Sequence, residues 1–259
     1  MKPTAGRREL GQHFLADVNI VAVAGRMAEL GSEDVVLEVG PGLGVLTTFL
    51  ADRTRHVHAI EIDRSLEPNL REVLAGRDDV NLVIDDALRH PLAELEPSPT
   101  KFVSNLPYNV ATPLVVESLD GLPSLELWTV MVQREVADRL FAVPGTKSYG
   151  AVSVLVQLTA EKTGFHPVSR SVFRPPPNVD SALVSFRRTR SWGPDYPPLK
   201  DLVQAAFAHR RKTLANSLEL SGRDRPRVET ALDAMGLLPT IRAEQLAPPD
   251  FVMLAGHLS

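Results

Sequence analysis

Glycines and polar residues follow four consecutive short apolar runs in the first half of the chain. The first run leads into the glycine-rich turn 40–44, the second ends at Glu61, the third precedes Asp86 and the fourth ends at Asn105. Glycines let a backbone turn tightly and approach a ligand. A carboxylate after the second run can accept hydrogen bonds from both ribose hydroxyls, and one after the third from an adenine amine. Each acid singly is more often a solvated loop residue, and the turn alone is weak evidence.

The elements that must position these residues alternate between strands and helices. We expect strands, rich in β-branched residues, over 35–39, 57–61, 80–84, 102–105 and 127–132. Helical spacing of apolar residues predicts helices over 18–30, 43–51, 65–75 and 113–119, the first with Asp17 as its N-cap. This alternation indicates a parallel sheet covered on both faces. The carboxyl ends of its strands meet at the edge where open α/β sheets bind ligands.

The second half of the chain has a different pattern. Two longer apolar runs, 151–158 and 179–186, are expected to pair as antiparallel strands at the far edge of the sheet. Only helical spacing follows, over 200–209, 225–235 and 249–257. We therefore expect a larger α/β domain over residues 1–188 and a small helical domain over 189–259.

Composition limits the chemistry. The chain has 259 residues, no cysteine, 44% hydrophobic residues and a formal net charge of -4, which is typical of globular proteins. Disulfides, thiolate metal sites and thiol nucleophiles are excluded, and no metal site is predicted. No apolar run reaches the ~18 residues of a membrane-spanning helix, and the N-terminus lacks the apolar stretch of a signal peptide. We expect a cytoplasmic monomer that does not contact membranes.

Charge is distributed unevenly. Residues 33–96 carry fourteen acidic residues against six arginines, whereas residues 187–227 carry ten basic residues against four acidic ones. A basic end of this kind is expected of a protein that holds a polyanion with one region and acts with another. The alternative is a solvated helix face.

The residues Asn-Leu-Pro-Tyr at 105–108 form the most specific pattern. They resemble the signature of S-adenosylmethionine-dependent methyltransferases that modify the exocyclic amine of adenine. This amine is a poor nucleophile because its lone pair is delocalised into the ring. If the Asn105 side-chain oxygen and the Pro107 carbonyl each accept one amine hydrogen, the lone pair can point at the methyl group. Tyr108 would stack on the flipped-out base. The alternative is a turn that binds no ligand.

Further segments make the resemblance specific to one family. They lie at 11–15, 37–44, 105–109, 132–140, 149–150, 173–181 and 206–214. In this order, over about residues 6–250, the chain resembles the small-subunit rRNA adenine dimethyltransferases, also called KsgA or RsmA. The resemblance implies an α/β, Rossmann-like class I methyltransferase sheet with a small C-terminal helical domain, and S-adenosylmethionine as cofactor. It also implies dimethylation of two adjacent adenosines in a hairpin loop near the 3′ end of 16S rRNA.

The resemblance implies a role for individual residues. Cofactor contacts fall to His13, Leu15, Gly40, Gly42, Glu61, Asp86 and Asn105. Catalysis at the base falls to Asn105, Pro107, Tyr108 and Phe173. Tyr108 and Phe173 would sandwich the target adenine, with Phe173 delivered by the prolines behind it; alternatively, Phe173 anchors its own loop. Bacterial members commonly have Asn where this chain has His13, which puts the contact made there in doubt.

Basic residues are expected to dock the rRNA. Arg210, Arg211 and Lys212 in the helical region, with Arg7 and Arg8 near the N-terminus, would pair with phosphates and supply affinity without sequence readout. The implied partner is 16S rRNA in a small-subunit assembly intermediate, and DNA is not expected.

Three alternative functions share parts of this pattern. A 23S rRNA adenine methylase of the macrolide-resistance type has the same fold and signature. A ribosome-assembly or transcription factor of this family could have a dispensable methyltransferase activity. An adenine-specific DNA methylase is a more distant alternative, because such enzymes often carry large target-recognition regions. The segments 105–109 and 210–214 are closer to the small-subunit family, and Glu61, Asp86, Asn105 and Tyr108 are intact.

Overall fold

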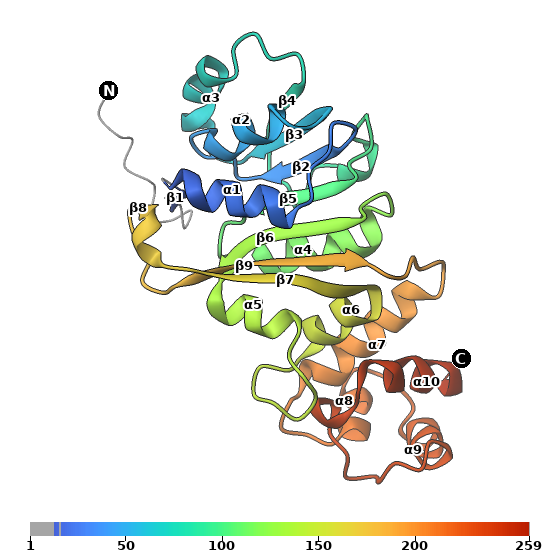
Figure 1. The fold of residues 1–259 in the computed structure, drawn as a ribbon. Coiled ribbons are helices and arrows are strands. Elements are labelled where there is room, and N and C mark those ends of the chain that lie inside the picture. Colours follow the sequence, from blue (N-terminus) through green and yellow to red (C-terminus); the bar gives the residue numbers. More distant parts are fainter. Residues whose placement is uncertain (1–12, 16, 259) are drawn as a thin grey trace. The chain divides into compact units, whose positions relative to one another are not determined.

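Within the residues that the structure describes, 13–15 and 17–258, seven strands form one mostly parallel sheet (Figure 1). The structure is a computed structural model. In spatial order the strands are β4 (Val80–Ile84), β3 (His56–Glu61), β2 (Val35–Val39), β5 (Lys101–Asn105), β6 (Leu127–Gln133), β9 (Ser181–Arg188) and β7 (Ala160–Val168). Strands β2 to β6 pair in parallel, and β9 pairs antiparallel with β6. The predicted Rossmann-like α/β sheet is therefore confirmed.

Helices lie on both faces of this sheet (Figure 1). They are α1 (Val18–Met27), α2 (Val45–Ala51), α3 (Glu67–Val73), α4 (Ala111–Gly121) and α5 (Arg134–Leu140), with 3-10 turns at Arg64–Leu66, Leu92–Glu94 and Arg170–Val172. Asp17 caps α1 as predicted, because its carboxylate accepts the Asn19 N–H at 2.8 Å. Two short strands, β1 (Phe14–Leu15) and β8 (Phe173–Arg174), form a separate antiparallel pair.

Burial explains why the central strands read as continuous apolar runs. All five residues of β2 are buried, and β6 is buried except at its last residue. Trp128 of β6 is fully buried and stacks on Phe186 of β9 with ring centroids 5.2 Å apart. Its indole N–H donates to the Ser118 hydroxyl of α4 at 2.8 Å. These contacts hold the antiparallel strand against the parallel part of the sheet and satisfy the only polar atom of the ring.

Contacts divide the chain into two compact units. The sheet unit extends to Ala137 and resumes over Glu161–Arg188, and the helical unit comprises Asp138–Ala160 and the chain from Thr189 onward. The expected domain 1–188 also ends at Arg188, but it includes 138–160, which groups with the helical unit. The reason is that the helix in this segment packs on helices near the C-terminus.

That helix overturns one prediction. The helical unit contains α6 (Ala151–Thr159), α7 (Tyr196–Ala208), α8 (Leu214–Leu220), α9 (Arg225–Ala234), α10 (Pro248–Leu258) and a 3-10 turn at Ala243–Gln245. The run 151–158, expected as a strand, is helical: the Ser153 hydroxyl accepts the Gly150 N–H at 3.1 Å, and the apolar residues 154–156 are buried. The edge strand is instead β7, which is largely exposed and was not predicted because its sequence is mostly polar.

Across residues 17–258, no helix combines the length and apolarity that crossing a bilayer demands.

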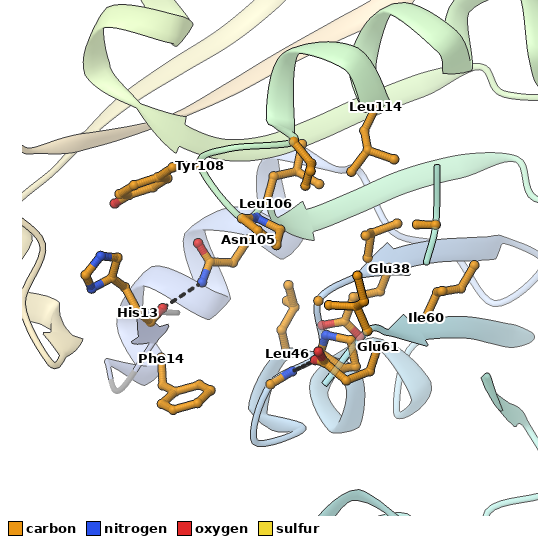
Figure 2. A pocket seen from close by; sticks show the side chains of 18 of the residues that line it. His13, Phe14, Glu38, Leu46, Ile60, Glu61, Asn105, Leu106, Tyr108 and Leu114 are labelled. Atoms are coloured by element: carbon orange, nitrogen blue, oxygen red, sulfur yellow. Dashed lines mark hydrogen bonds between the residues drawn. The ribbon is translucent and has the colours of Figure 1, made fainter. Parts of the chain in front are cut away.

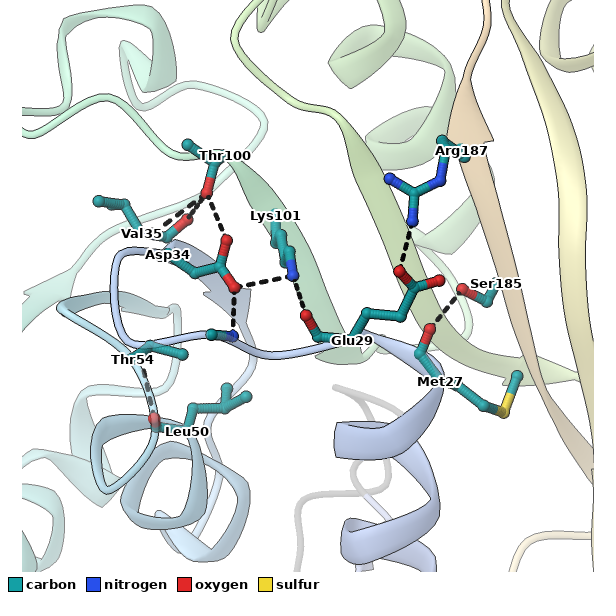
Figure 3. Close-up of polar contacts among 11 residues, drawn as sticks. Met27, Glu29, Asp34, Val35, Leu50, Thr54, Thr100, Lys101, Ser185 and Arg187 are labelled. Atoms are coloured by element: carbon teal, nitrogen blue, oxygen red, sulfur yellow. Dashed lines mark hydrogen bonds and ion pairs between the residues drawn. The ribbon is translucent and has the colours of Figure 1, made fainter.

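A polar network holds the amino-terminal edge of the sheet (Figure 3). Lys101 at the start of β5 is nearly buried, and its ammonium lies 2.7 Å from the Asp34 carboxylate and also donates to the Glu29 carbonyl. The other Asp34 oxygen accepts from Thr100 at 3.4 Å. Glu29 in turn pairs with Arg187 of β9 at 2.6 Å. The connection from α1 to β2 is thereby tied to two further strands.

We predict that Asp34→Ala lowers the free energy of unfolding by about 3–5 kcal/mol, because Lys101 is left nearly buried without its counterion. Denaturant titrations measure the loss, provided that the unfolding free energy of both proteins has the same dependence on denaturant concentration. The neighbouring exposed acid gives the control, since Glu33→Ala should change stability by less than about 0.5 kcal/mol. A similar small change in both variants would contradict a stabilising role for the network.

Candidate active site

A pocket lies at the edge of the sheet where β2, β3, β4 and β5 end (Figure 2). Nine of the residues predicted from the sequence line it: His13, Leu15, Gly40, Gly42, Glu61, Asp86, Asn105, Pro107 and Tyr108. The parallel register explains the convergence, because Val39 is opposite Ile60 and Glu61 is opposite Ile84. Residues that follow these strands therefore lie side by side.

The glycine-rich turn and Glu61 form one hydrogen-bonded wall of the pocket. Gly42 has φ 62°, and a Cβ there would lie 2.9 Å from the Phe14 ring. The Glu61 carboxylate is 4% exposed and accepts the Gly42 N–H at 3.1 Å and the Asp63 N–H at 2.9 Å. Burial raises the pKa of Glu61, and these two N–H donors oppose the shift. Each carboxylate oxygen still has a lone pair for a ligand donor.

The loop after β4 is ordered by its own acids. Asp86 accepts the Leu88 N–H at 3.0 Å, and Asp85 is hydrogen-bonded to the His90 ring at 2.9 Å. The hydrogen bond from His90 lowers the pKa of Asp85. The loop therefore presents two carboxylates to the pocket.

Hydrogen bonding fixes the orientation of the Asn105 amide. Its Nδ2 donates to the backbone carbonyl of His13 at 3.2 Å, which leaves Oδ1 as the free acceptor end of the group (Figure 2). His13 is itself held, since Nδ1 lies 2.9 Å from the Pro175 carbonyl, an acceptor only. Nδ1 therefore carries a proton, and in the neutral ring Nε2 is the acceptor.

Tyr108 lies beside His13 at the same end of the pocket (Figure 2). The two ring centroids are 5.4 Å apart, with their planes inclined by 35°. The Tyr108 hydroxyl is 2.7 Å from the hydroxyl of Ser181, which is 1% exposed. Burial raises the pKa of Tyr108, so the ring carries a neutral phenol. The next residue back, Pro107, packs against the turn, since a Cβ on Gly40 would meet its ring at 3.3 Å.

Phe173 is not where the sequence-based reasoning expected it. Its side chain is fully buried and belongs to the cluster that contains Leu15, Val21 and Met131. It pairs with Leu15 across the β1–β8 ladder and is absent from the pocket lining. Core packing holds the ring here, in agreement with the alternative of an anchor for its loop, and the role of Phe173 in sandwiching the base stays a prediction.

The basic residues have three different outcomes. Arg7 and Arg8 lie outside the described residues. Arg210 is held within the helical unit, where its guanidinium donates to the Tyr149 carbonyl at 2.9 Å and the Lys147 carbonyl at 3.2 Å. Arg211 and Lys212 are exposed. All three side chains of this cluster have solvent access, but Arg210 is also engaged by backbone carbonyls of its own unit.

Sequence reasoning missed Glu38, which also lines the pocket. It lies in the buried strand β2 and is 1% exposed. Burial raises the pKa of Glu38 to about 8, and the charge of Glu61 adds to the shift. The signal was present in the sequence, because an acid interrupts the run Val-Val-Leu-Glu-Val directly before the glycine-rich turn.

Comparison with known protein families identifies the family of this chain. The model of the family "Ribosomal RNA adenine dimethylase" matches residues 4–255, almost the whole chain. The chain belongs to the ribosomal RNA adenine dimethylase family.

Individual relatives agree with this assignment. Ribosomal RNA small subunit methyltransferase A of Rubrobacter xylanophilus is 48% identical over 253 residues, covering 98% of this chain and 95% of the relative. The crystal structure of the 23S rRNA methyltransferase ErmE is 33% identical with a TM-score of 0.67, covering 95% and 99% of the two chains. A dimethyladenosine transferase from Plasmodium falciparum has a TM-score of 0.78 at 24% identity, covering 93% and 96%, and supports the fold.

The protein is therefore an S-adenosylmethionine-dependent rRNA adenine dimethyltransferase, and the resemblance to the KsgA/RsmA family is confirmed. The pocket suits this methyl donor. Its acidic lining residues are Glu38, Glu61, Asp85 and Asp86, and no lysine or arginine from the described part of the chain joins them. A sulfonium cofactor brings the positive charge that such a pocket lacks.

We predict that Phe173→Ala costs the dimethylase about 3–5 kcal/mol of stability, as expected for deleting a fully buried aromatic ring. Thermal or denaturant unfolding measures the loss. Phe173→Leu, which keeps most of the volume, is the control and should cost less than about 1.5 kcal/mol. An alanine variant as stable as the wild type would show that the ring leaves the core readily.

Proposed function

We propose that this dimethylase converts two adjacent adenosines in a hairpin loop near the 3′ end of 16S rRNA to N,N-dimethyladenosines, within a small-subunit assembly intermediate. The high identity to a small subunit methyltransferase A supports the choice of subunit. The single observation that carries the chemistry is the Asn105 amide, whose nitrogen is occupied by the His13 carbonyl. Its oxygen is therefore available to a ligand donor.

The chain's own groups then prepare the adenine amine. Asn105 Oδ1 and the Pro107 carbonyl each accept one amine hydrogen, so that the nitrogen lone pair leaves the plane of the ring. Tyr108, fixed by Ser181, stacks on the flipped base and holds this geometry. Bound S-adenosylmethionine supplies an electrophilic methyl group. The amine loses a proton after transfer, and no strongly basic side chain is required.

Cofactor contacts are assigned to the other pocket residues. Glu61 accepts from the ribose hydroxyls and Asp86 from the cofactor's adenine amine. The open backbone at Gly40 and Gly42 allows close approach, because side chains at these positive-φ positions would collide with Pro107 or Phe14. His13 and Leu15 close the same wall of the pocket.

The second transfer imposes a further requirement. A monomethylated amine has one hydrogen left, so Asn105 and Pro107 cannot both be satisfied. The pocket must then accommodate the first methyl group by rotation about the carbon–nitrogen bond.

That the protein is a monomer and is located in the cytoplasm stays a prediction.

Methylation of isolated ribosomal subunits tests the substrate assignment. Small and large subunits that lack the modification are incubated with the enzyme and S-adenosylmethionine, and digested rRNA is mapped by mass spectrometry. We expect two adjacent dimethyladenosines near the 3′ end of 16S rRNA and none in 23S rRNA. Modification of 23S rRNA alone would favour the macrolide-resistance type of activity instead.

In the same assay, Asn105→Ala should lower turnover on the order of 10²-fold while changing S-adenosylmethionine binding by no more than a few-fold, because it removes an acceptor for the target amine. Asn19→Ala, which removes an exposed amide outside the pocket lining, is the control and should leave turnover unchanged. Full turnover by the Asn105 variant would contradict the proposed role.

Docking of the rRNA makes a separate prediction. Arg211→Glu combined with Lys212→Glu should weaken small-subunit binding and reduce its dependence on salt, without altering cofactor affinity, because both side chains are exposed. Arg55→Glu combined with Lys162→Glu changes the same charge at exposed positions of the sheet unit and is the control. Equal effects of the two pairs would exclude a specific docking site.

A further inference from the structure

One oxygen of the buried Glu38 carboxyl has no hydrogen-bond partner among the residues that the structure describes. Oε2 is fully buried and is not bonded to any group within the described residues. Glu38 stands in the centre of the sheet and at the wall of the cofactor pocket, two residues before Gly40. A buried, unbonded carboxyl oxygen is costly, and the cost is much greater when the group is charged. Because Glu38 lies at the pocket wall, a bound ligand can change the relative stability of its neutral and charged forms.

Within the part of the chain that the structure describes, no cation stands near enough to balance a charge on Glu38. Glu61 of β3 lies on the same face of the sheet, and its charge is negative. On β5 the only cation is Lys101, which is at the opposite end of the strand and paired with Asp34. On α1, Arg26 is exposed to solvent.

The remaining neighbours do not supply a positive charge either. Thr47 of α2 has a buried, neutral hydroxyl, which partly opposes the rise in the pKa of Glu38, but burial has the larger effect. Asp85 and Asp86, on the loop after β4, are acids, and His13 has its Nδ1 directed at the Pro175 carbonyl. No positive charge from the described residues therefore faces Glu38, and a bound cation would supply the missing counter-charge.

We propose that Glu38 carries a proton in the ligand-free pocket and releases it to solvent when the cationic S-adenosylmethionine binds. This inference rests on the use of that methyl donor. The carboxyl O–H bond breaks, the proton passes to water, and the carboxylate faces the positive charge of the ligand; no other bond changes. Binding is then linked to pH, and affinity rises as the solution becomes more basic.

The magnitude follows from the pKa of Glu38. At a pKa of about 8, raised by burial, binding at pH 7 should release about 0.9 proton from this group. The dissociation constant should fall about tenfold between pH 7 and pH 9, because the unbound enzyme no longer has to give up a proton.

Isothermal titration calorimetry tests this with S-adenosylmethionine and the full-length enzyme. Titrations at pH 7 in buffers of different ionisation enthalpy give the number of protons released. Glu38→Gln should lose this release, and its affinity should rise less between pH 7 and pH 9 than that of the wild type, because the amino group of the ligand titrates equally in both. Asp86→Asn removes a pocket carboxyl that is partly exposed, and should weaken binding while releasing as many protons as the wild type.

Stability without ligand provides a second readout. The folded protein keeps the Glu38 proton up to a pKa of about 8, whereas the unfolded chain loses it near 4.5. Stability should therefore fall as pH rises through this window in the wild type, and fall less in Glu38→Gln.

Equal proton release by the wild type and Glu38→Gln would overturn the proposal, as would a wild-type affinity that does not vary with pH. If Glu38→Gln fails to fold, the wild-type proton release and affinity profile decide alone. Absence of any S-adenosylmethionine binding to the folded wild type would overturn the methyl-donor assignment and this inference together, whereas binding without proton release would overturn only the inference.

Discussion

Parallel hydrogen bonding between β2, β3, β4 and β5 places the carboxyl ends of these strands along one edge of the sheet, and the pocket consists largely of the residues that come directly after them. Every chemical role depends on this register. A shift of one residue would turn side chains such as Glu38 and Asn105 to the other face. The buried apolar side chains of β2, β3 and β5 resist such a shift, because it would exchange the side chains that pack on the two faces of the sheet.

The pocket combines this geometry with an unusual electrostatic balance. Carboxylates line it without a lysine or arginine from the described residues, and two of the acids, Glu38 and Glu61, are almost fully buried. Glu61 is stabilised by backbone N–H groups of the glycine-rich turn and of Asp63. Glu38 lacks comparable donors at Oε2. Glu61 is thus held as a hydrogen-bond acceptor, whereas the protonation of Glu38 is sensitive to the charge of the ligand.

The amino-acid pattern predicted the sheet and most of the pocket because both depend on local signals: apolar runs, turn residues and the polar residues at strand ends. The pattern was misleading where contacts between distant parts of the chain determine the structure of a segment or the environment of a side chain. Residues 151–158 alternate valines as a strand would, yet they pack as a helix within the helical unit. Arg210 looked like a free cation, but backbone carbonyls far along the chain hold it. Glu38 was overlooked because it sits inside a strand and not after one.

The proline-rich segment after Phe173 illustrates how a correct motif can have a different physical role. Phe173 packs in the core and pairs with Leu15, which positions the start of the chain's described part against the pocket. The Pro175 carbonyl then accepts from His13, and Ser181 at the end of the segment bonds to Tyr108. The segment therefore orients two rings of the pocket and adds none of its own. Rigid prolines suit this task, because a backbone acceptor can orient His13 only if its own position is fixed.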